Sequence, residues 1–376
     1  MNVRRLVFAG EALVDVVLRV PALPERGGDV FATSSEVTVG GGFNVMAAAA
    51  RQGLPVLYAG GHGTGPWGDL VRAALAAEGI TILRPPDPAR DTGFDVALVE
   101  PDGERTFATH VGAETVGRWD DVPAGAGDMV YVSGYGLAAR GGAREEDFGG
   151  QSSGTPPRIS PAPPASPLFV DPGPLVAQIS GEILDQVLAR CDWLSCNDRE
   201  AALLTGGAEA ADAARLLLER TARASVIVRT GASGCVLALR GEEIARIPAP
   251  VVEVIDTTGA GDTHAGVFIA ALGEGLTPAQ AASRANAAAA FSVTRPGPAT
   301  SPTRATLDAW LAPPPLGKRG RDGVSAALFG AAPRPRRNAA DTPQAPRVRR
   351  LHTTSPRVSP SARQYRAEAK KRVRSE

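Results

Sequence analysis

The chain has 376 residues, 43% of them hydrophobic, which is enough for a sizeable core in one large or two ordinary domains. Its formal net charge is zero, yet residues 313–376 hold sixteen of the 40 Lys and Arg residues and four of the 40 Asp and Glu residues, so the preceding body is acidic. An acidic body argues against a broad basic surface for nucleic acid.

The cysteines and the N-terminus indicate the compartment. Cys191, Cys196 and Cys235 form neither a CxxC pair nor an even-numbered disulfide framework, which favours buried thiols in a reducing compartment. The first apolar stretch is interrupted by Glu11 and Asp15, too early for a signal peptide, and no run has the length that spans a bilayer. We therefore expect a cytoplasmic protein without a membrane partner.

The first half of the chain alternates between strand and helix patterns. Strand patterns occupy residues 6–9, 13–20, 30–39 and 56–59, and helix patterns occupy 44–52 and 67–78. This rhythm favours a parallel sheet covered by helices. Residues 94–100 and 105–110 flank Asp102-Gly103, a strong hairpin signal. Together with the early extended pair, this hairpin predicts a small second sheet, a lid formed by residues 12–39 and 92–111.

The second half resumes the rhythm but contains two segments without a core pattern. Strand patterns lie at residues 129–132, 168–170, 193–195 and 225–228, and helix patterns at 176–189 and 208–220. Residues 139–166 are rich in Gly, Pro and Ser where a parallel crossover normally places a helix, so we predict an irregular insert. The basic, Pro- and Arg-rich segment 313–376 is predicted to be disordered, leaving one domain over residues 1–312.

The stretch IDTTGAGDTH, residues 255–264, carries the clearest chemistry. Apolar residues lead into it and a helix pattern follows, so Gly259, Ala260 and Gly261 lie at a helix N-terminus, where free backbone N–H groups attract anions. An acid in the same turn repels a resting phosphate but suits a general base next to a phosphoryl group in transfer. Asp262 is therefore either that base or a simple helix-dipole acid.

Two signatures resemble one family. DTTGAGD with its following helix, and VGGGFNVMAAAARQG at residues 39–53, resemble the signatures of the ribokinase-like (PfkB) carbohydrate kinases, and the resemblance extends over about residues 3–312. ALVEPDGERTF and VSGYGLA resemble a bacterial sugar kinase branch. The resemblance implies a three-layer α/β fold with a small β-sheet lid. It also implies transfer of a phosphoryl group from ATP to a hydroxymethyl group of a sugar, or of a nucleoside.

The resemblance implies roles for individual residues. Asp262 would be the base, with Gly259, Ala260 and Gly261 forming an anion hole. The sugar would be bound by Asp15, Gly40, Gly41 and Asn44. Asn197 and Glu200, in an NxxE motif, would place Mg²⁺ and the ATP phosphates, while Thr230 and Gly231 would contact the nucleotide and Asn286 would flank the adenine. A potassium ion would be held mainly by backbone oxygens, at Asp256, Thr258, Arg295 and Gly297, with Ser301 nearby. Lid strands could also pair two subunits into a homodimer.

For several of these residues a role other than the implied one remains open. Asp15 could be an exposed lid acid, the NxxE motif a chance match, and Asn286 a solvent-facing residue. Met46 and Val267 replace small residues of the family pattern, and the glycine loop before Asn44 is one residue short. With a missing crossover helix the protein could be a folded but inactive relative, and segments 139–166 and 313–376 could be out-of-frame sequence.

Other function classes have weaker support. The segment from Gly63 to Gly68 matches the dinucleotide-binding pattern GxGxxG, but it follows the second parallel strand, contains Pro66 and would pair with Asp87 in a Pro-rich loop. The four histidines form no metal-ligand spacing, and His264, two residues after Asp262, is expected to pack or to line a pocket rim.

Overall fold

The computed structural model describes residues 3–116, 122–141, 166–222 and 224–312. These residues belong to one unit, Met1–Leu328. The predicted tail 313–376 and most of the predicted insert, residues 142–165, lie outside the described residues.

A nine-stranded sheet forms the centre of this unit. The strands lie in the order β13-β12-β11-β10-β9-β8-β1-β4-β5. Their bounds are β1 (Arg5–Phe8), β4 (Val56–Tyr58), β5 (Thr81–Ile82), β8 (Asp128–Ser133), β9 (Leu168–Asp171), β10 (Trp193–Asn197), β11 (Ser225–Arg229), β12 (Cys235–Ala238) and β13 (Ala245–Ile247). All neighbouring pairs are parallel except β11 with β12 and β12 with β13. The continuous apolar runs of the central strands are typical of strands covered on both faces.

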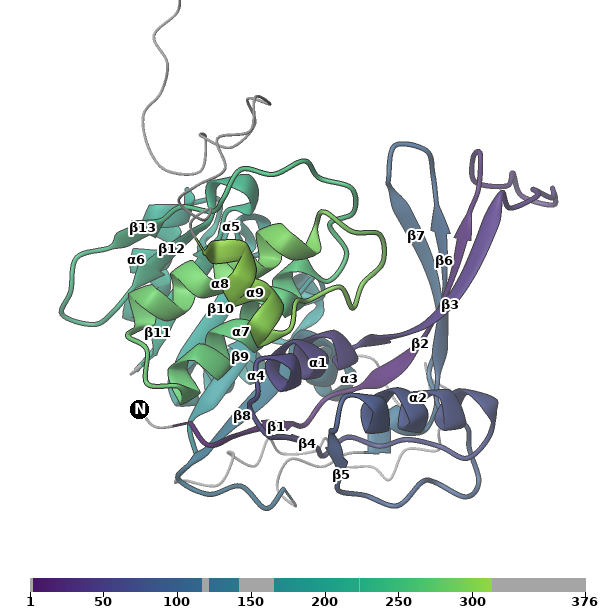
Figure 1. The fold of residues 1–376 in the computed structure, drawn as a ribbon, viewed down its shortest axis with the longest axis horizontal. Coiled ribbons are helices and arrows are strands. Elements are labelled where there is room, and N and C mark those ends of the chain that lie inside the picture. Colours follow the sequence, from purple (N-terminus) through teal and green to yellow (C-terminus); the bar gives the residue numbers. More distant parts are fainter. Residues whose placement is uncertain (1–2, 117–121, 142–165, 223, 313–376) are drawn as a thin grey trace, which may run out of the picture. The chain divides into compact units, whose positions relative to one another are not determined.

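A second sheet of four strands confirms the predicted small second sheet, which we call the lid. β2 (Ala12–Arg19), β3 (Ser34–Gly41), β6 (Phe94–Val99) and β7 (Arg105–His110) lie in the order β3-β2-β6-β7. The β6–β7 hairpin turns at Gly103, whose φ of +87° favours glycine. The two early strands join it through a parallel β2–β6 pairing, and Figure 1 shows the four strands as a separate sheet beside α1 and α2.

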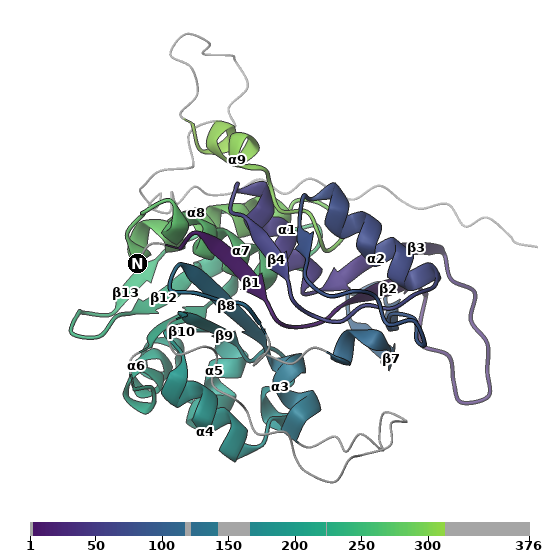
Figure 2. The same ribbon diagram turned by 90° about the horizontal axis from the view of Figure 1, so that it is seen from below.

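Helices cover both faces of the large sheet, as Figure 2 shows. On one side lie α1 (Phe43–Arg51), α2 (Pro66–Ala77), α7 (Ala260–Gly273), α8 (Pro278–Ser292) and α9 (Arg304–Leu311). On the other lie α3 (Gly134–Gly141), α4 (Gly181–Arg190), α5 (Asp198–Thr205) and α6 (Ala210–Arg220). Short 3-10 turns occur at η1 (Ala113–Val116), η4 (Val176–Gln178) and η5 (Gly231–Ser233). Each helical layer has its own apolar core against the sheet, which confirms the three-layer α/β class.

The prediction that the β8–β9 crossover lacks a helix is wrong for its first part. α3 begins directly after β8 and runs through residues 139–141, the start of the predicted irregular insert. Its Leu137 and Ala138 are buried in the core on that side of the sheet. The two glycines at its start weaken the helix pattern, but burial of its apolar residues compensates. Residues 142–165 lie outside the described part.

α7 is packed on nearly all sides, and this fixes the position of the turn that precedes it. Ten consecutive residues, Thr263 to Leu272, are buried. A Cβ at Gly266 would lie 2.4 Å from the Val45 carbonyl oxygen, so this glycine allows close contact with α1. Met46 and Val267, the two departures from the family pattern, are both buried in this core and act in packing.

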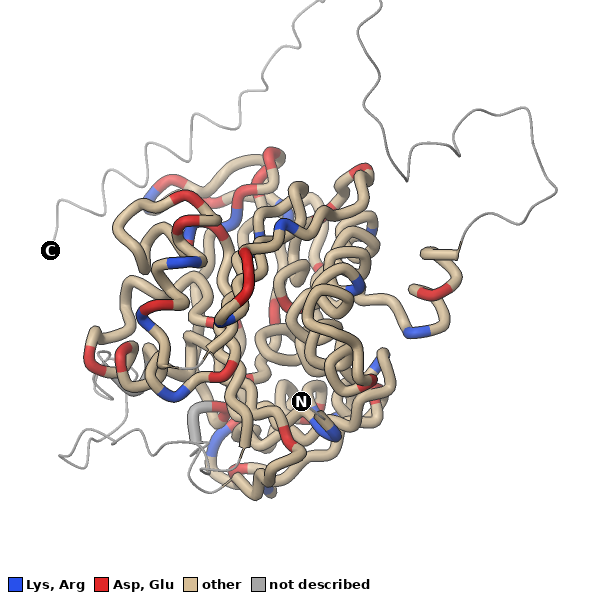
Figure 3. The backbone as a smooth tube through the Cα atoms, turned by 90° about the vertical axis from the view of Figure 1, so that its left-hand side faces the viewer, with Lys and Arg blue, Asp and Glu red and all other residues tan. Residues whose placement is uncertain are grey.

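The described chain mixes charges of both signs and buries its three cysteines. Figure 3 shows Asp and Glu interspersed with Lys and Arg along the described chain. Cys191, Cys196 and Cys235 are buried free thiols, as predicted. Of the helices in the described ranges, none is both long enough and apolar enough to cross a bilayer.

Candidate active site

The glycine-rich turn leads into the N-terminus of α7, as the motif predicts. Gly259 is the N-cap with a φ of +70°, and a Cβ there would lie 2.2 Å from the Pro298 carbonyl oxygen, so the position admits only glycine. Asp262 lies in the first turn of this fourteen-residue helix. The Ala260 N–H donates to the Thr257 carbonyl oxygen at 3.3 Å, and the positive end of the helix dipole favours an anion beside Asp262.

Asp262 is half-buried and has one side-chain hydrogen-bond partner from a distant element. Asn44, at the start of α1, donates from Nδ2 to Oδ2 of Asp262 at 3.2 Å. Burial and the charge of Asp171 raise the pKa of Asp262 to about 6, against the opposing effects of Asn44 and Arg229. A carboxylate with this pKa is ionised at neutral pH and is basic enough to accept a proton from a bound hydroxyl.

The lid brings Asp15 to the same place. A Cβ at Gly40 would lie 2.0 Å from Oδ2 of Asp15, so the glycine of β3 leaves room for the carboxylate on β2. Burial, followed by the charges of Asp95 and Asp262, raises the pKa of Asp15 to about 7. Gly41 follows with a φ of +60° as the chain turns toward α1. Asp15 is half-buried, and the alternative of a fully exposed lid acid is wrong.

Glu11 is a further acid of this site that the motifs did not indicate. It precedes β2 and accepts a hydrogen bond from Ser133 Oγ at 3.0 Å. Burial raises its pKa to about 7, and the charges of Glu114 and Asp262 act in the same direction against its hydrogen bonds. Glu11 follows β1 and Ser133 ends β8, and these two strands are parallel neighbours. The Glu11 carboxylate therefore lies at the same edge of the sheet, where the charge of Asp262 acts on it.

Arg229 is a second residue that sequence reasoning missed. It ends β11, and its Nη1 donates to Asp171 Oδ2 and to Ser195 Oγ, each at 2.6 Å. A Cβ at Gly261 would lie 3.5 Å from the Arg229 guanidinium carbon, so the cation lies beside the glycine turn. The signal was the position of a basic residue at the carboxyl end of a buried strand, next to Thr230 and Gly231.

The NxxE motif forms the cap of α5. Asn197 accepts from the Glu200 backbone N–H, and Glu200 accepts from the Asn197 backbone and side-chain nitrogens, each at 2.8 Å. Glu200 is buried, which raises its pKa, and Arg229 Nη2 lies 3.7 Å from its Oε2. Because both Glu200 oxygens already accept hydrogen bonds, the pair fits a positioning role better than direct coordination of Mg²⁺. In the described residues no cluster of three or more His, Cys, Asp or Glu side chains could hold a metal ion.

Of the other predicted nucleotide contacts, Gly231 follows β11 and Asn286 contacts the end of β13. Gly231 begins the turn after β11 with a φ of +57°, and a Cβ there would meet open space. Asn286 is buried on α8 and donates to the carbonyl oxygens of Ile247 and Pro248 at 2.9 and 3.3 Å. It therefore holds the chain that leaves β13, and the solvent-facing alternative is wrong.

Asp256 ties together the two loops predicted to hold potassium. Its carboxylate accepts hydrogen bonds from Thr258 N and Oγ1, at 2.9 and 2.6 Å, and from Gly297 N at 3.1 Å. The Arg295 side chain lies over Phe291, with its guanidinium carbon 3.5 Å from the centre of that ring, so a contact of Arg295 with the cation would come from its backbone oxygen. Ser301 Oγ is buried without a hydrogen-bond partner in the described structure, which fits a cation contact. The oxygen-rich loops are thus compatible with a monovalent cation.

The lid also contacts this loop directly. Arg105, the first residue of β7, donates from Nη2 to Asp256 Oδ1 at 2.8 Å. Burial alone raises the pKa of Asp256, but the hydrogen bonds from Thr258 and Gly297 and the charge of Arg105 outweigh burial and lower it. Asp256 therefore stays ionised and joins the lid to the glycine turn.

The dinucleotide alternative fails on geometry. Asp91 accepts hydrogen bonds from the backbone N–H groups of Trp67 and Gly68, at 3.1 and 2.8 Å, in the first turn of α2. A Cβ at Gly63 would collide with the backbone of Asp91 at 2.4 Å. A carboxylate of the chain itself therefore occupies the place where a pyrophosphate would bind.

His264 packs in the core. It is buried on α7, its ring lies parallel to that of Phe268 with centroids 6.3 Å apart, and neither ring nitrogen has a hydrogen-bond partner in the described structure. Burial, followed by the charge of Arg229, lowers its pKa to about 3 against the opposing effect of the nearby Asn286 side chain. The histidine is thus neutral at physiological pH and is not a proton carrier.

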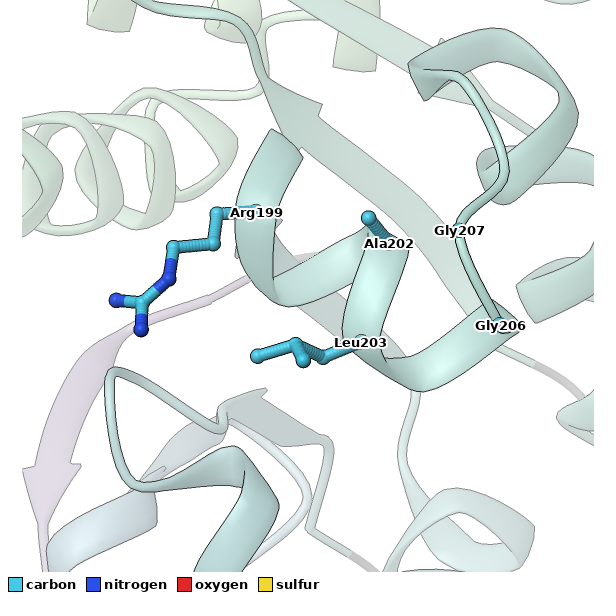
Figure 4. A pocket seen from close by; sticks show the side chains of 5 residues that line it. All are labelled: Arg199, Ala202, Leu203, Gly206 and Gly207. Atoms are coloured by element: carbon cyan, nitrogen blue, oxygen red, sulfur yellow. The ribbon is translucent and has the colours of Figure 1, made fainter.

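A shallow hollow beside α5 lies outside this constellation. Figure 4 shows its lining residues, Arg199, Ala202, Leu203, Gly206 and Gly207. These five include no carboxylate or other general base, so we assign no chemistry to the hollow.

Known proteins match the chain over most of its length. A family model described as pfkB family carbohydrate kinase matches residues 3–147 and 170–305. An uncharacterised sugar kinase of Escherichia coli (strain K12), YegV, is 33% identical over 313 residues, which cover 80% of this chain and 92% of that protein.

Two solved structures share the fold. Ribokinase of Arabidopsis thaliana complexed with ribose and ATP is 23% identical, with a TM-score of 0.65 over 82% of this chain and 98% of its own. Adenosine kinase of Sinorhizobium meliloti is 22% identical, with a TM-score of 0.67 over 83% of this chain and 100% of its own. At these identities the likeness concerns the fold alone.

Proposed function

This chain belongs to the pfkB family of carbohydrate kinases, and we propose that it transfers the γ-phosphoryl group of ATP to a hydroxymethyl group of a sugar, with Asp262 as the general base. The observation that carries the proposal is the position of Asp262. It lies in the first turn of α7, directly after the glycine turn, with an ionised side chain oriented by Asn44. A base and an anion-binding turn side by side are what phosphoryl transfer to a hydroxyl requires.

In the proposed reaction the Asp262 carboxylate takes the proton of the acceptor hydroxyl as the hydroxyl oxygen attacks the γ-phosphorus. The bond from that phosphorus to the β–γ bridging oxygen breaks, and ADP leaves with the electron pair. The backbone N–H groups of Gly259, Ala260 and Gly261 stabilise the charge on the phosphoryl group in transit. Arg229 supplies a fixed positive charge beside the turn, held by Asp171.

The remaining residues bind and orient the two substrates. Asp15, Gly40, Gly41 and Asn44 surround the acceptor, and closure of the lid over it excludes water, which would otherwise take the phosphoryl group. Thr230 and Gly231 contact the nucleotide, whereas Asn197, Glu200 and Asn286 position the elements around it.

Mg²⁺ bound to ATP supplies charge neutralisation at the phosphates. Potassium beside Asp256 and Ser301 is part of the same proposal, and so is a homodimer through the lid, whose edge strands β3 and β7 expose Val37 and Phe107.

The test is Asp262→Asn, which keeps the size of the side chain and removes the base. We expect kcat to fall at least about 100-fold while ATP binding is retained, measured by coupled ADP release and by calorimetry with ATP. Residual activity above about a tenth would contradict the base assignment. A melting curve of the wild-type protein, together with turnover of any acceptor, separates an active enzyme from a folded but inactive relative.

A further inference from the structure

The lid carries a second carboxylate beside Asp15. Asp95 of β6 is the direct partner of Asp15 of β2 in the parallel register. Resting on the kinase function above, we propose that Asp95 is a hydroxyl-binding residue of the acceptor site, which with Asp15 selects a free sugar over a nucleoside.

The register places both carboxylates on the face of the lid that looks toward the glycine turn. Residues paired across neighbouring strands project on the same face, and alternate residues along a strand share it. Thr109 of β7 is the partner of Asp95, so Arg105, four residues earlier on β7, lies on that face too. Because Arg105 bonds to Asp256, this face is turned toward the loop that precedes α7.

Two acceptor atoms in this region have no partner. Oδ1 of Asp95 is buried without a hydrogen bond in the described structure, and so is Oδ1 of Asn44. Asn44 is only 6% exposed, and its Nδ2 is already bonded to Asp262, so its free oxygen belongs to the same site as the proposed base. A buried acceptor left unpaired is costly, and a bound ligand with O–H donors removes that cost.

The acids of the lid and of the glycine turn all act electrostatically on one side chain, Tyr135, which is 48% exposed. Tyr135 lies at the start of α3, and partial burial, followed by the charges of Glu11, Asp262, Asp95 and Asp15, raises the pKa of its hydroxyl to about 12. The four acids come from three segments of the chain, Glu11 with Asp15, Asp95 of β6 and Asp262 of α7, so the tertiary fold assembles them. In their ionised forms these carboxylates only accept hydrogen bonds, so the complementary ligand is one that carries many hydroxyl donors.

Hydroxyl number then separates the two acceptor classes. One hydroxyl must face Asp262, a carboxylate such as Asp15 can take two neighbouring hydroxyls, and Asp95 takes another. A ribonucleoside has only its 2′ and 3′ hydroxyls besides the one that is phosphorylated. A free pentose or hexose has at least one more, and Asp95 has no partner unless that additional hydroxyl is present.

The experiment compares wild type, Asp95→Ala and Asp95→Asn with D-ribose, D-fructose and adenosine as acceptors. We expect wild type to prefer one of the sugars over adenosine by at least about tenfold in kcat/KM. Asp95→Ala should raise KM for that sugar about 10- to 100-fold, the usual effect of losing one hydrogen bond to a charged group, with KM for ATP unchanged. One monodeoxy analogue of the sugar should be used equally well by wild type and by Asp95→Ala, because it lacks the hydroxyl that Asp95 binds.

The control is Asp102→Asn, the same type of change at the exposed tip of the same hairpin, where Oδ1 accepts from Glu104 N. It should leave both KM values unchanged. Two results would overturn the inference while leaving the kinase proposal intact. One is a preference of the wild type for adenosine, and the other is an unchanged KM for the sugars in folded Asp95→Asn and Asp95→Ala variants. The opposite case is that none of the acceptors elicits ADP release while calorimetry shows sugar binding that Asp95→Ala abolishes. In that case the kinase proposal fails and the binding role of Asp95 stands.

Discussion

Nη2 of Arg105 lies 2.8 Å from Oδ1 of Asp256, and this ion pair joins the first residue of lid strand β7 to the loop before the glycine turn. The same Oδ1 also accepts a hydrogen bond from Thr258 Oγ1, and Oδ2 of Asp256 accepts one from Gly297 N. The contact therefore connects the lid to the place where the phosphoryl group is proposed to pass.

Arg105→Gln should loosen the lid. The pair is partly shielded, with 27% of the Arg105 and 10% of the Asp256 side chain exposed, so its loss should cost about 1–2 kcal/mol, between the values for exposed and buried pairs. We expect KM for the acceptor to rise up to about tenfold and ATP hydrolysis without acceptor to increase, because water reaches the site. Arg19→Gln, at an exposed position of the same sheet, is the control. Unchanged hydrolysis and unchanged KM would show that the ion pair does not hold the lid.

The rate should depend on pH through Asp262. Its pKa is raised from the ordinary value to about 6, so the basic form is lost as the pH falls through 6. We expect kcat/KM to increase about tenfold between pH 5 and pH 7 and then to level off, with a broadened transition because Asp15 titrates nearby. In Asn44→Ala the transition should move to higher pH, since the hydrogen bond that lowers the pKa of Asp262 is gone. A rate independent of pH over this range would argue against a carboxylate base.

The two buried histidines should respond in opposite ways to replacement by phenylalanine. His264 has no hydrogen-bond partner and already stacks on Phe268, so His264→Phe should raise the free energy of unfolding by about 1–2 kcal/mol and Tm by a few degrees. His62 pairs through Nε2 with the Arg84 carbonyl and through Nδ1 with Arg72 Nη1, at 3.0 and 3.3 Å. His62→Phe should therefore lower stability by about 1–3 kcal/mol. Denaturant unfolding of both variants checks this, and a change of the same sign in both would refute it.

Much of the fold was predictable because it depends on local patterns. The Asp102-Gly103 turn predicted the β6–β7 hairpin, and apolar runs between helix patterns predicted the central parallel strands. The misses have physical causes. β5 has only two residues, too short for any periodicity, and α3 begins at a glycine-rich segment that becomes helical because its apolar residues are buried.

The sequence by itself determined the glycine turn with Asp262 at the start of α7, since consecutive residues and a helix N-terminus create that chemistry locally. Only the tertiary structure decided what surrounds Asp262. Asn44 reaches it across 218 positions of the chain, and Arg105 reaches Asp256 across 151. The register of the lid placed Asp95 beside Asp15, and the order of the parallel strands placed Arg229 beside Gly261. Such contacts depend on how whole elements pack. Asp95 belongs to no motif, and the position of Arg229 at the end of a buried strand becomes informative only once the order of the strands is known.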